Sequence, residues 1–142
     1  MTKVKDVVHE RETYTAAVEQ TVFDIARYMV ERNIGAVPVV REGRLVGIFS
    51  ERDIMKRVVA ESRDPRATKV ADIMTKNPVV VTPETSIDEC MHLMKTNNCR
   101  HLPICDGERL KGLISLRDIL AHEIAEKEDE ARHLKAYIHS NT

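Results

Sequence analysis

Residues 47–53 read Gly-Ile-Phe-Ser-Glu-Arg-Asp, and residues 112–118 read Gly-Leu-Ile-Ser-Leu-Arg-Asp. In both stretches a short apolar run ends at a Ser, and an Asp follows three residues after that Ser. This spacing is typical of the first turn of a helix, where the two side chains accept hydrogen bonds from free backbone N–H groups. Each stretch therefore predicts a strand that ends near the Ser and a helix that begins directly after it.

The two stretches are part of a longer duplication. A shift of 65 residues aligns the two halves of the chain without a gap. Outside the two stretches, identical residues at matched positions include Met29 and Met94, Asn33 and Asn98, Pro38 and Pro103, Arg44 and Arg109, and Leu45 and Leu110. A weaker match precedes each half, because residues 4–8 resemble residues 70–74 and both predict a short leader helix. Self-similarity at one fixed shift indicates two copies of a single structural unit.

Each half predicts the element order β-α-β-β-α, so the predicted fold class is α+β. The expected strands are 12–16, 36–40 and 45–49 in the first half, and 79–82, 101–105 and 110–114 in the second. A helix with apolar side chains on one face follows Thr21 in the first half and Ser86 in the second. Turns are expected at Glu42-Gly43 and Asp106-Gly107, and the last helices open at Ser50 and Ser115.

The predicted organisation is a first repeat with its leader helix at residues 1–62, a polar connector at 63–69 and a second repeat at 70–122. Residues 123–142 are highly charged and rich in helix formers, which predicts a helical extension. A broken apolar stripe runs from Ile119 to Ile138. Two interpretations of it are equally open: a solvated extension of the last helix that frays at 140–142, or a partner helix in a dimer.

Composition excludes several classes of protein. The 22 basic and 23 acidic residues leave a formal charge of −1, so the chain lacks the excess of basic residues that is typical of nucleic-acid-binding proteins. No apolar run approaches the roughly 18 residues that suggest a membrane span. The N-terminal residues 1–6 contain no apolar signal core, and the three cysteines are an odd number, so reduced thiols in the cytoplasm are expected.

The two repeated stretches also carry groups that suit a nucleotide. A helix N-terminus favours a phosphate, and the hydroxyls of Ser50 and Ser115 can donate to one. The carboxylates of Asp53 and Asp118, one turn later, can accept from both hydroxyls of a ribose. Arg52 and Arg117 add permanent positive charge for a phosphate. Ile48 and Leu113 can form the wall of a slot for a flat base. The simpler interpretation is that each Ser and Asp only caps its own helix.

On these residues the repeats resemble cystathionine-β-synthase (CBS) domains, whose signature is Gly-hydrophobic-x-Ser/Thr-x-x-Asp at the end of the third strand. The resemblance covers about residues 3–122. It implies two repeats packed through their sheets about a pseudo-two-fold axis, an arrangement called a Bateman module. It also implies two clefts between the repeats, of which one or both hold adenosine compounds. Ser50 and Asp53 would serve one cleft, and Ser115 and Asp118 the other.

The resemblance further implies which side chains surround the base. For the cleft of Asp118 these are Tyr14, Ile34, Gly35 and Leu113, and for the cleft of Asp53 they are Val79, Cys99, Arg100 and Ile48. Arg100 and His101 stand where similar repeats place phosphate-facing basic residues, whereas the first repeat has Gly35 and Ala36 there. The two clefts are therefore expected to differ in affinity, without an indication of which is tighter. His101 is equally open to interpretation as an ordinary strand residue.

The predicted function is a regulatory module, without catalysis, that binds an adenine nucleotide and acts as a homodimer or on an unknown regulated protein. AMP is the first expectation, and ADP, ATP and NAD are the alternatives. No Ser lies in a Gly-x-Ser-x-Gly elbow, which argues against a nucleophilic enzyme. Two other classes stay open: a homodimerisation module with empty clefts, and a metal or redox sensor built on Cys99, His101 and Cys105. No metal is expected in the first interpretation.

Overall fold

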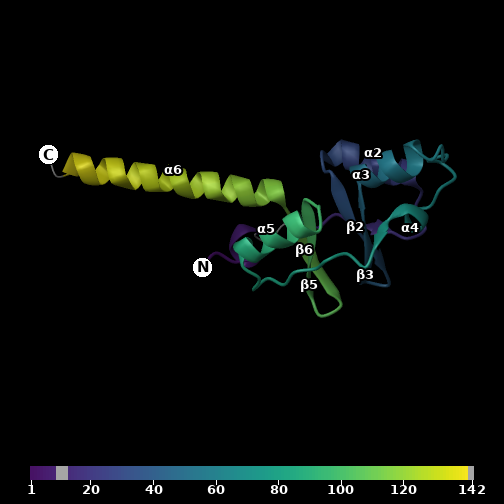
Figure 1. The fold of residues 1–142 in the computed structure, drawn as a ribbon, viewed down its shortest axis with the longest axis horizontal. Coiled ribbons are helices and arrows are strands. Elements are labelled where there is room, and N and C mark those ends of the chain that lie inside the picture. Colours follow the sequence, from purple (N-terminus) through teal and green to yellow (C-terminus); the bar gives the residue numbers. More distant parts are fainter. Residues whose placement is uncertain (9–12, 141–142) are drawn as a thin grey trace.

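The computed structural model describes residues 1–8 and 13–140. The first repeat contains β1 (Ala16–Ala17), α2 (Val22–Arg32), β2 (Ala36–Arg41), β3 (Arg44–Ser50), α3 (Glu51–Asp53) and the π-helical turn η1 (Ile54–Val59). The second contains α5 (Ile87–Thr96), β5 (His101–Asp106), β6 (Arg109–Ser115) and α6 (Leu116–Ser140). The leader helices are α1 (Val4–Val7) and α4 (Val70–Ile73), and β4 (Thr75–Lys76) follows α4. The two repeats lie side by side, and α6 projects away from them (Figure 1).

The sheet confirms the predicted α+β class and the duplicated hairpins. In each repeat the second and third strands pair antiparallel, with an irregularity in register after Val39 in one hairpin and after Ile104 in the other. β1 adds to β2 in parallel, and β3 pairs with β6 at Arg44 and Arg109. The resulting strand order is β1-β2-β3-β6-β5, so the sheets of the two repeats are continuous at one corner.

Local sequence signals explain where the helices begin and end. The hydroxyl of Thr21 accepts from the Asp24 N–H at 3.2 Å, and the hydroxyl of Ser86 accepts from the Glu89 N–H at 3.1 Å. These bonds satisfy donors that the first helical turn leaves unpaired. α2 ends at Asn33, whose φ of 53° is the left-handed conformation that closes many helices.

Several expected boundaries were wrong. The first strand is Ala16–Ala17 and not 12–16; residue 12 lies outside the described residues. The expected strand 79–82 is reduced to a single bridge between Val81 and Ile104. Asp106 is the last residue of β5, so the second turn is made by Gly107 and Glu108. These errors have one physical source, because short strands and turns depend on the neighbouring strand more than on local sequence.

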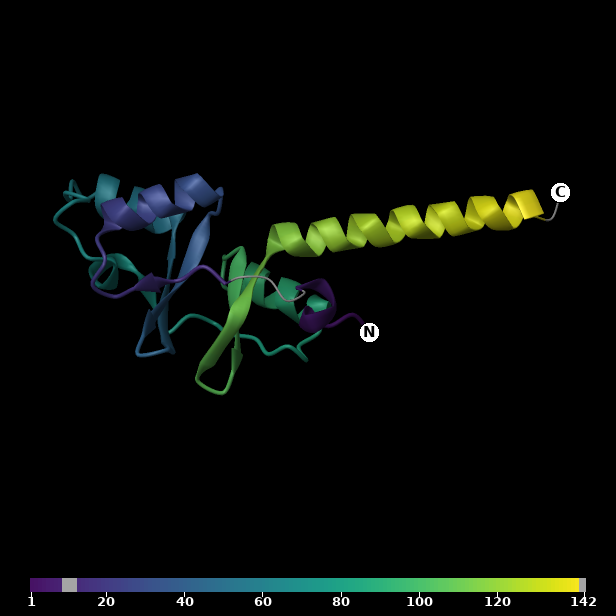
Figure 2. The ribbon, with the colours of Figure 1, turned by 180° about the vertical axis from the view of Figure 1, so that it is seen from behind.

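Each repeat has its own hydrophobic core, and the leader helices are exchanged between these cores. Val70 and Ile73 of α4 are buried with the core of the first repeat, whereas Val4 of α1 is buried with the core of the second. Backbone bonds hold the exchange: Val4 N–H donates to Thr85 O and Val70 N–H donates to Gln20 O, both at 2.8 Å. Figure 2 shows α1 beside α5 accordingly. The boundaries at residues 62, 69 and 122 stay predictions.

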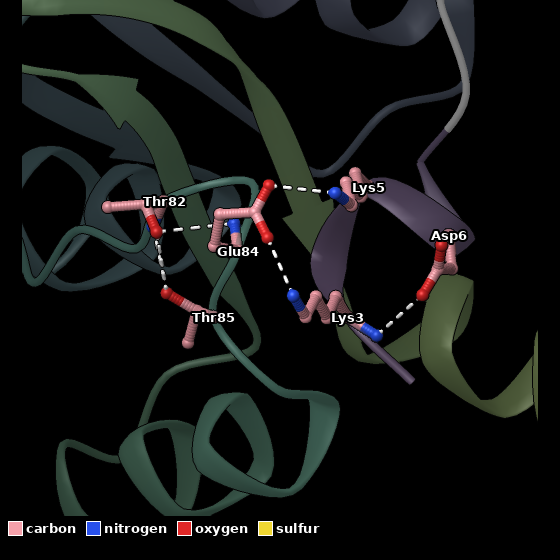
Figure 3. A network of polar contacts seen from close by, with 6 residues as sticks. All are labelled: Lys3, Lys5, Asp6, Thr82, Glu84 and Thr85. Carbon is pink, nitrogen blue, oxygen red and sulfur yellow. Dashed lines mark hydrogen bonds and ion pairs between the residues drawn. The ribbon is translucent and has the colours of Figure 1, made fainter. Parts of the chain in front are cut away.

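Charged side chains fasten α1 to the loop before α5 (Figure 3). The ammonium groups of Lys3 and Lys5 donate to the two carboxylate oxygens of Glu84, at 2.7 and 2.8 Å. The same loop is closed on itself by a bond from the Thr82 N–H to the Thr85 hydroxyl at 3.0 Å. The leader helix of one repeat is thereby tied to the entry of a helix in the other.

The last helix runs without interruption from Leu116 to Ser140, which confirms the predicted extension. Fraying was expected at residues 140–142; Ser140 is the last helical residue, and residues 141–142 lie outside the described part of the chain. Over residues 1–8 and 13–140, no helix combines the length and the apolarity that a membrane crossing requires.

Candidate functional site

A cavity of about 1410 Å³ lies between the two repeats. Ligand pockets for small molecules are typically about 300–1,000 Å³, so this cavity is large enough for a ligand of nucleotide size. Both repeats form its wall. It is lined by nine of the residues that the sequence predicted, namely Tyr14, Ile34, Gly35, Arg100, His101, Leu113, Ser115, Arg117 and Asp118.

Asp118 lies at the start of α6, where the strand β6 ends at the edge of the cavity. The Ser115 N–H donates to Asp118 Oδ2 at 2.8 Å, and the Asp118 N–H donates to Ser115 Oγ at 3.0 Å. The two residues therefore cap the helix, as the simpler interpretation expected. Capping does not remove them from the cavity, because both are half-buried and both line it. The cap instead fixes the direction of the Asp118 carboxylate.

Positive charge predominates among the ionised side chains that line the cavity. Arg100, Lys5, Lys111 and Arg117 contribute four cations, and Glu51 and Asp118 contribute two carboxylates. A phosphate is compatible with this excess, because charged hydrogen bonds to phosphate are stronger than neutral ones. The acidic Asp118 provides acceptors for hydroxyl groups in the same space.

His101 begins β5 and stands close to the first repeat. A Cβ atom placed on Gly35 would lie 3.7 Å from His101 Cε1 and 3.3 Å from Glu51 Oε1, so the glycine leaves room for both side chains. Burial lowers the pKa of His101 below its ordinary value, with Arg100 and Arg117 acting in the same direction. Asp118 and Glu51 oppose this shift. Burial therefore favours the neutral imidazole here, against the effect of the two carboxylates.

Asp53, the counterpart of Asp118 in the first repeat, is buried and bonded within the protein. Asp53 is only 7% exposed. Its Oδ2 accepts from the Ser50 N–H at 2.9 Å and from the Ser50 hydroxyl at 3.2 Å, and its Oδ1 accepts from the Thr75 hydroxyl at 3.2 Å. Both oxygens of the Asp53 carboxylate are thus engaged within the protein.

The strand β4 covers the remaining approach to Asp53. A Cβ atom on Gly47 would lie 2.6 Å from Met74 Sδ and 2.9 Å from Thr75 O, so β3 and β4 pack backbone against backbone here. The guanidinium of Arg52, expected to bind a phosphate, donates to Asn98 O at 2.6 Å. The Ser50, Arg52 and Asp53 side chains therefore bond to the protein itself.

The other residues expected around Asp53 are dispersed. Ile48 is half-buried and paired with Pro38 and Thr75. Val79 and Cys99 are partly buried against the core of the second repeat. Arg100, which was expected beside Asp53, lines the cavity of Asp118 instead.

The metal and redox interpretation finds no support in the structure. Among residues 1–8 and 13–140, no three His, Cys, Asp or Glu side chains are grouped so that they could hold a metal ion. The irregularity after Ile104 breaks the strand alternation, and Cys105 is buried in the core. Burial raises the pKa of the Cys99 and Cys105 thiols, and it raises that of Cys90 to about 11. Such thiols are poor nucleophiles and poor metal ligands.

Sequence reasoning missed Lys5, Glu51, Lys111 and the α6 residues Leu120 and Ile124, all of which line the cavity. Glu51 lies inside the repeated stretch, and its counterpart in the second repeat is the apolar Leu116. This difference between the two copies was the signal in the sequence that could have indicated a role for Glu51. Nothing in the local sequence indicated Lys5, because it reaches the cavity only through the exchange of the leader helices.

Comparison with known proteins agrees with this architecture. The sequence profile of the CBS domain matches residues 4–60 and 70–124. A mitochondrial CBS domain-containing protein of Arabidopsis thaliana, CBSX3, is 36% identical over 125 residues, covering 84% of this chain; the chain spans 61% of that relative's length. A putative signal-transduction protein with CBS domains from Burkholderia ambifaria is 40% identical, with a TM-score of 0.83, over 87% of this chain and 95% of that one.

A third similar structure contains ligands. It is the CBS domain pair of protein MJ0100 in complex with 5′-methylthioadenosine and S-adenosyl-L-methionine. It is 26% identical, with a TM-score of 0.78, and the match covers 88% of this chain and 98% of that one.

Proposed function

The chain belongs to the CBS-domain family, and from that premise we propose that it binds one adenine nucleotide in the cavity of Asp118, with AMP preferred over ADP, ATP and NAD. CBS pairs of this kind commonly act as regulatory modules. The nucleotide would be a signal and not a substrate. The observation that carries the proposal is the convergence of Asp118, Arg100, Arg117 and Tyr14 on one cavity between the repeats.

Each part of a nucleotide has a complementary group in this cavity. Tyr14, Ile34 and Leu113 supply flat or apolar surface for the base. Asp118 offers carboxylate oxygens to the two ribose hydroxyls, and Ser115 and the N-terminus of α6 lie one turn before it. Arg100 and Arg117 offer planar donors to a phosphate. A phosphorylated ligand suits these cations better than S-adenosylmethionine, which is itself cationic.

The volume of the cavity leaves the larger nucleotides possible. NAD is the nearest competitor, because its adenylate half would make the same contacts as AMP. We prefer AMP because Arg100 and Arg117 both lie near the start of α6. A single phosphate placed there would contact both guanidinium groups and the helix N-terminus.

Regulation by the nucleotide would be possible because both repeats contribute residues to the wall of the cavity. Tyr14 and Gly35 belong to the first repeat, and Arg117 and Asp118 belong to the second. A ligand that contacts both repeats stabilises the relative packing in which those contacts form. A partner protein, or a second copy of this chain, could then bind that packing more tightly, as linkage requires.

The alternative is a homodimerisation module with an empty cavity, in which Ser115 and Asp118 serve only as caps. The hydrogen bonds between Ser115 and Asp118 are consistent with that alternative. Helix capping does not explain why the cations of Arg100, Arg117 and Lys111 line the same cavity. Like charges placed together without a ligand destabilise a protein, so a binding role explains them better.

Calorimetric titration separates the two functions. We expect AMP to bind with one site per chain, and ADP, ATP, NAD and S-adenosylmethionine to bind more weakly. The variant Asp118→Asn keeps the size of the side chain but presents an NH₂ group to the ribose, so its affinity for AMP should fall roughly tenfold or more. The matched variant Asp53→Asn should bind AMP as wild type does. Equal losses in both variants, or no binding of any nucleotide, would contradict the proposal.

A further inference from the structure

Helix α6 carries a largely apolar stripe that begins at the cavity wall and continues along the part that leaves the body of the protein. The matched repeats end at residue 124, and α6 continues to Ser140. Along it, Leu120 is 45% exposed, Ile124 59%, Leu134 60% and Ile138 51%. Lys127 and Ala131 lie between them and are also exposed. These six residues, the α6 stripe, are spaced alternately by four and three positions, which places them on one face of the helix.

The spacing is that of a two-stranded coiled coil, in which such positions pack against another helix. On the opposite face, two pairs of polar side chains contact each other within the helix. His122 Nε2 lies 3.1 Å from Glu126 Oε1, and Arg132 is paired with Asp129. One face of the projecting helix is therefore apolar except at Lys127, and the other is polar.

We propose that the α6 stripes of two copies of this chain pair in antiparallel orientation. In the antiparallel register centred on residue 129, Leu120 of one copy opposes Ile138 of the other, and Ile124 opposes Leu134. The long side chain of Lys127 opposes the small Ala131 twice, so the central layers pair a large with a small side chain, and the outer layers each pair a Leu with an Ile. Glu128 and Glu130 flank this centre and provide carboxylates for the ammonium of Lys127 of the other copy.

The parallel orientation does not match the same residues. Lys127 would oppose Lys127, which brings like charges together in the seam, and Ala131 would oppose Ala131, which leaves a void. The charge of Lys127 and the small volume of Ala131 therefore both favour the antiparallel pair.

The pair would bring the second copy to the cavity. Leu120 and Ile124 line both the α6 stripe and the cavity wall. In the antiparallel register the end of the partner helix, at Leu134 and Ile138, covers these two residues. The partner thus completes the apolar end of the cavity. This consequence rests on the proposed function, whereas the pairing of the helices does not.

Sedimentation velocity of the full chain, without nucleotide, tests the pairing. Wild type should be a dimer at micromolar concentration. Leu134→Glu and Ile138→Glu each place a charge in the stripe and should yield monomers. The matched control Ala136→Glu places the same charge on the opposite face and should remain a dimer. A monomeric wild type, or dimers that survive both stripe variants, would refute the proposal.

Distance measurement between spin labels tests the orientation. A label is attached at Ser140→Cys in a chain that also carries Cys99→Ser. In the antiparallel register the backbones at the two labelled positions are separated along the helix axis by about 22 residues, or roughly 33 Å. In a parallel pair the separation reduces to little more than the interaxial distance of about 8–10 Å plus the label arms. The short distance would overturn the antiparallel proposal, and neither measurement depends on nucleotide binding.

Discussion

Asp118 and Asp53 occupy matched positions in the two repeats, yet their surroundings differ. Asp53 is buried and accepts from Thr75 of β4, whereas Asp118 is half-buried at the wall of the cavity. The second repeat also places Arg100 and His101 where the first has Gly35 and Ala36. The glycine matters as much as the basic residues, because it leaves the space into which His101 and Glu51 extend.

His101 should make nucleotide binding depend on pH. Burial holds the pKa of His101 below 6.5 in the free protein, against the opposing effect of Asp118 and Glu51. A phosphate in the cavity favours the imidazolium and raises that pKa. AMP affinity should therefore rise as the pH falls from about 8 to about 6, by up to roughly tenfold for each unit by which binding raises the pKa.

Titration calorimetry of wild type and His101→Gln over this range measures the effect. The phosphate of AMP titrates in the same region, so the readout is the difference between the two proteins. Arg100 and Arg117, which also face His101, keep their charge throughout. Parallel pH profiles for the two proteins would exclude a role for His101.

At the scale of elements, the leader helix α4 and the strand β4 that follows it close the cleft of Asp53. β4 follows α4 and pairs with β3 at Gly47 and Ile48, so it lies over the position that Asp53 would otherwise present. The segment that matches β4 by the shift of 65 or 66 is residues 9–11, which lie outside the described part of the chain. Gly112, the counterpart of Gly47, instead lines the cavity.

The two glycines provide a matched pair of substitutions. Gly47→Ala should lower the free energy of unfolding by about 1–3 kcal/mol, because its Cβ would meet Met74 Sδ at 2.6 Å and Thr75 O at 2.9 Å. Gly112→Ala should change it by less than about 1 kcal/mol, since the nearest atom is Ile104 Cδ1 at 3.6 Å. Urea unfolding of both variants gives the comparison, and similar values for the two would contradict the closed packing of β3 and β4.

The attachment of α1 should weaken in acid. Lys3 and Lys5 lower the pKa of Glu84 from 4.5 to about 2 through the hydrogen bonds they donate to it. Because the folded pKa lies below the unfolded one, this contribution is present above about pH 4.5 and is lost as the pH falls toward 2. Glu84 is exposed, so the effect on global stability should be small.

Amide hydrogen exchange measures whether the attachment of α1 weakens. The Val4 and Lys5 amides donate to Thr85 O and Pro83 O, and their protection should fall in Glu84→Gln at neutral pH and in wild type between pH 4.5 and 2. The control Glu19→Gln removes an exposed carboxylate of the first repeat and should leave both amides protected. Unchanged protection in Glu84→Gln would mean that the backbone bonds and Val4 alone hold α1.

Elements that depend on local sequence were predicted well. The caps at Thr21, Ser86, Ser50 and Ser115 lie where the sequence indicated them, because a cap needs only its own first turn. The leader exchange was not predicted, since Val4 and Val70 are equally apolar and nothing nearby specifies which core they join. Arg100 was expected beside Asp53 and lines the cavity of Asp118 instead, because its position depends on how the two repeats pack.

At the scale of the whole molecule, the two halves are similar in sequence, but the clefts at Asp53 and Asp118 differ in structure. The duplicated motif predicted two similar clefts, and the sequence indicated only that they would differ in affinity. The difference between the clefts depends on β4, which covers Asp53, and on Glu51, Arg100 and His101, which line the cavity of Asp118; their mutual positions arise from tertiary packing. The long α6 was predicted as a helix, but its straight projection beyond the repeats could not be read from periodicity (Figure 1).

A crystal structure of the chain grown with AMP tests the central claim most directly. The account predicts one AMP per chain, with both ribose hydroxyls donating to Asp118, the phosphate near Arg100 and Arg117, and the base against Tyr14 and Leu113. Asp53 should still accept from Thr75 in that structure. An AMP molecule seated at Asp53, or an Asp118 carboxylate that contacts no part of a bound nucleotide, would contradict the account.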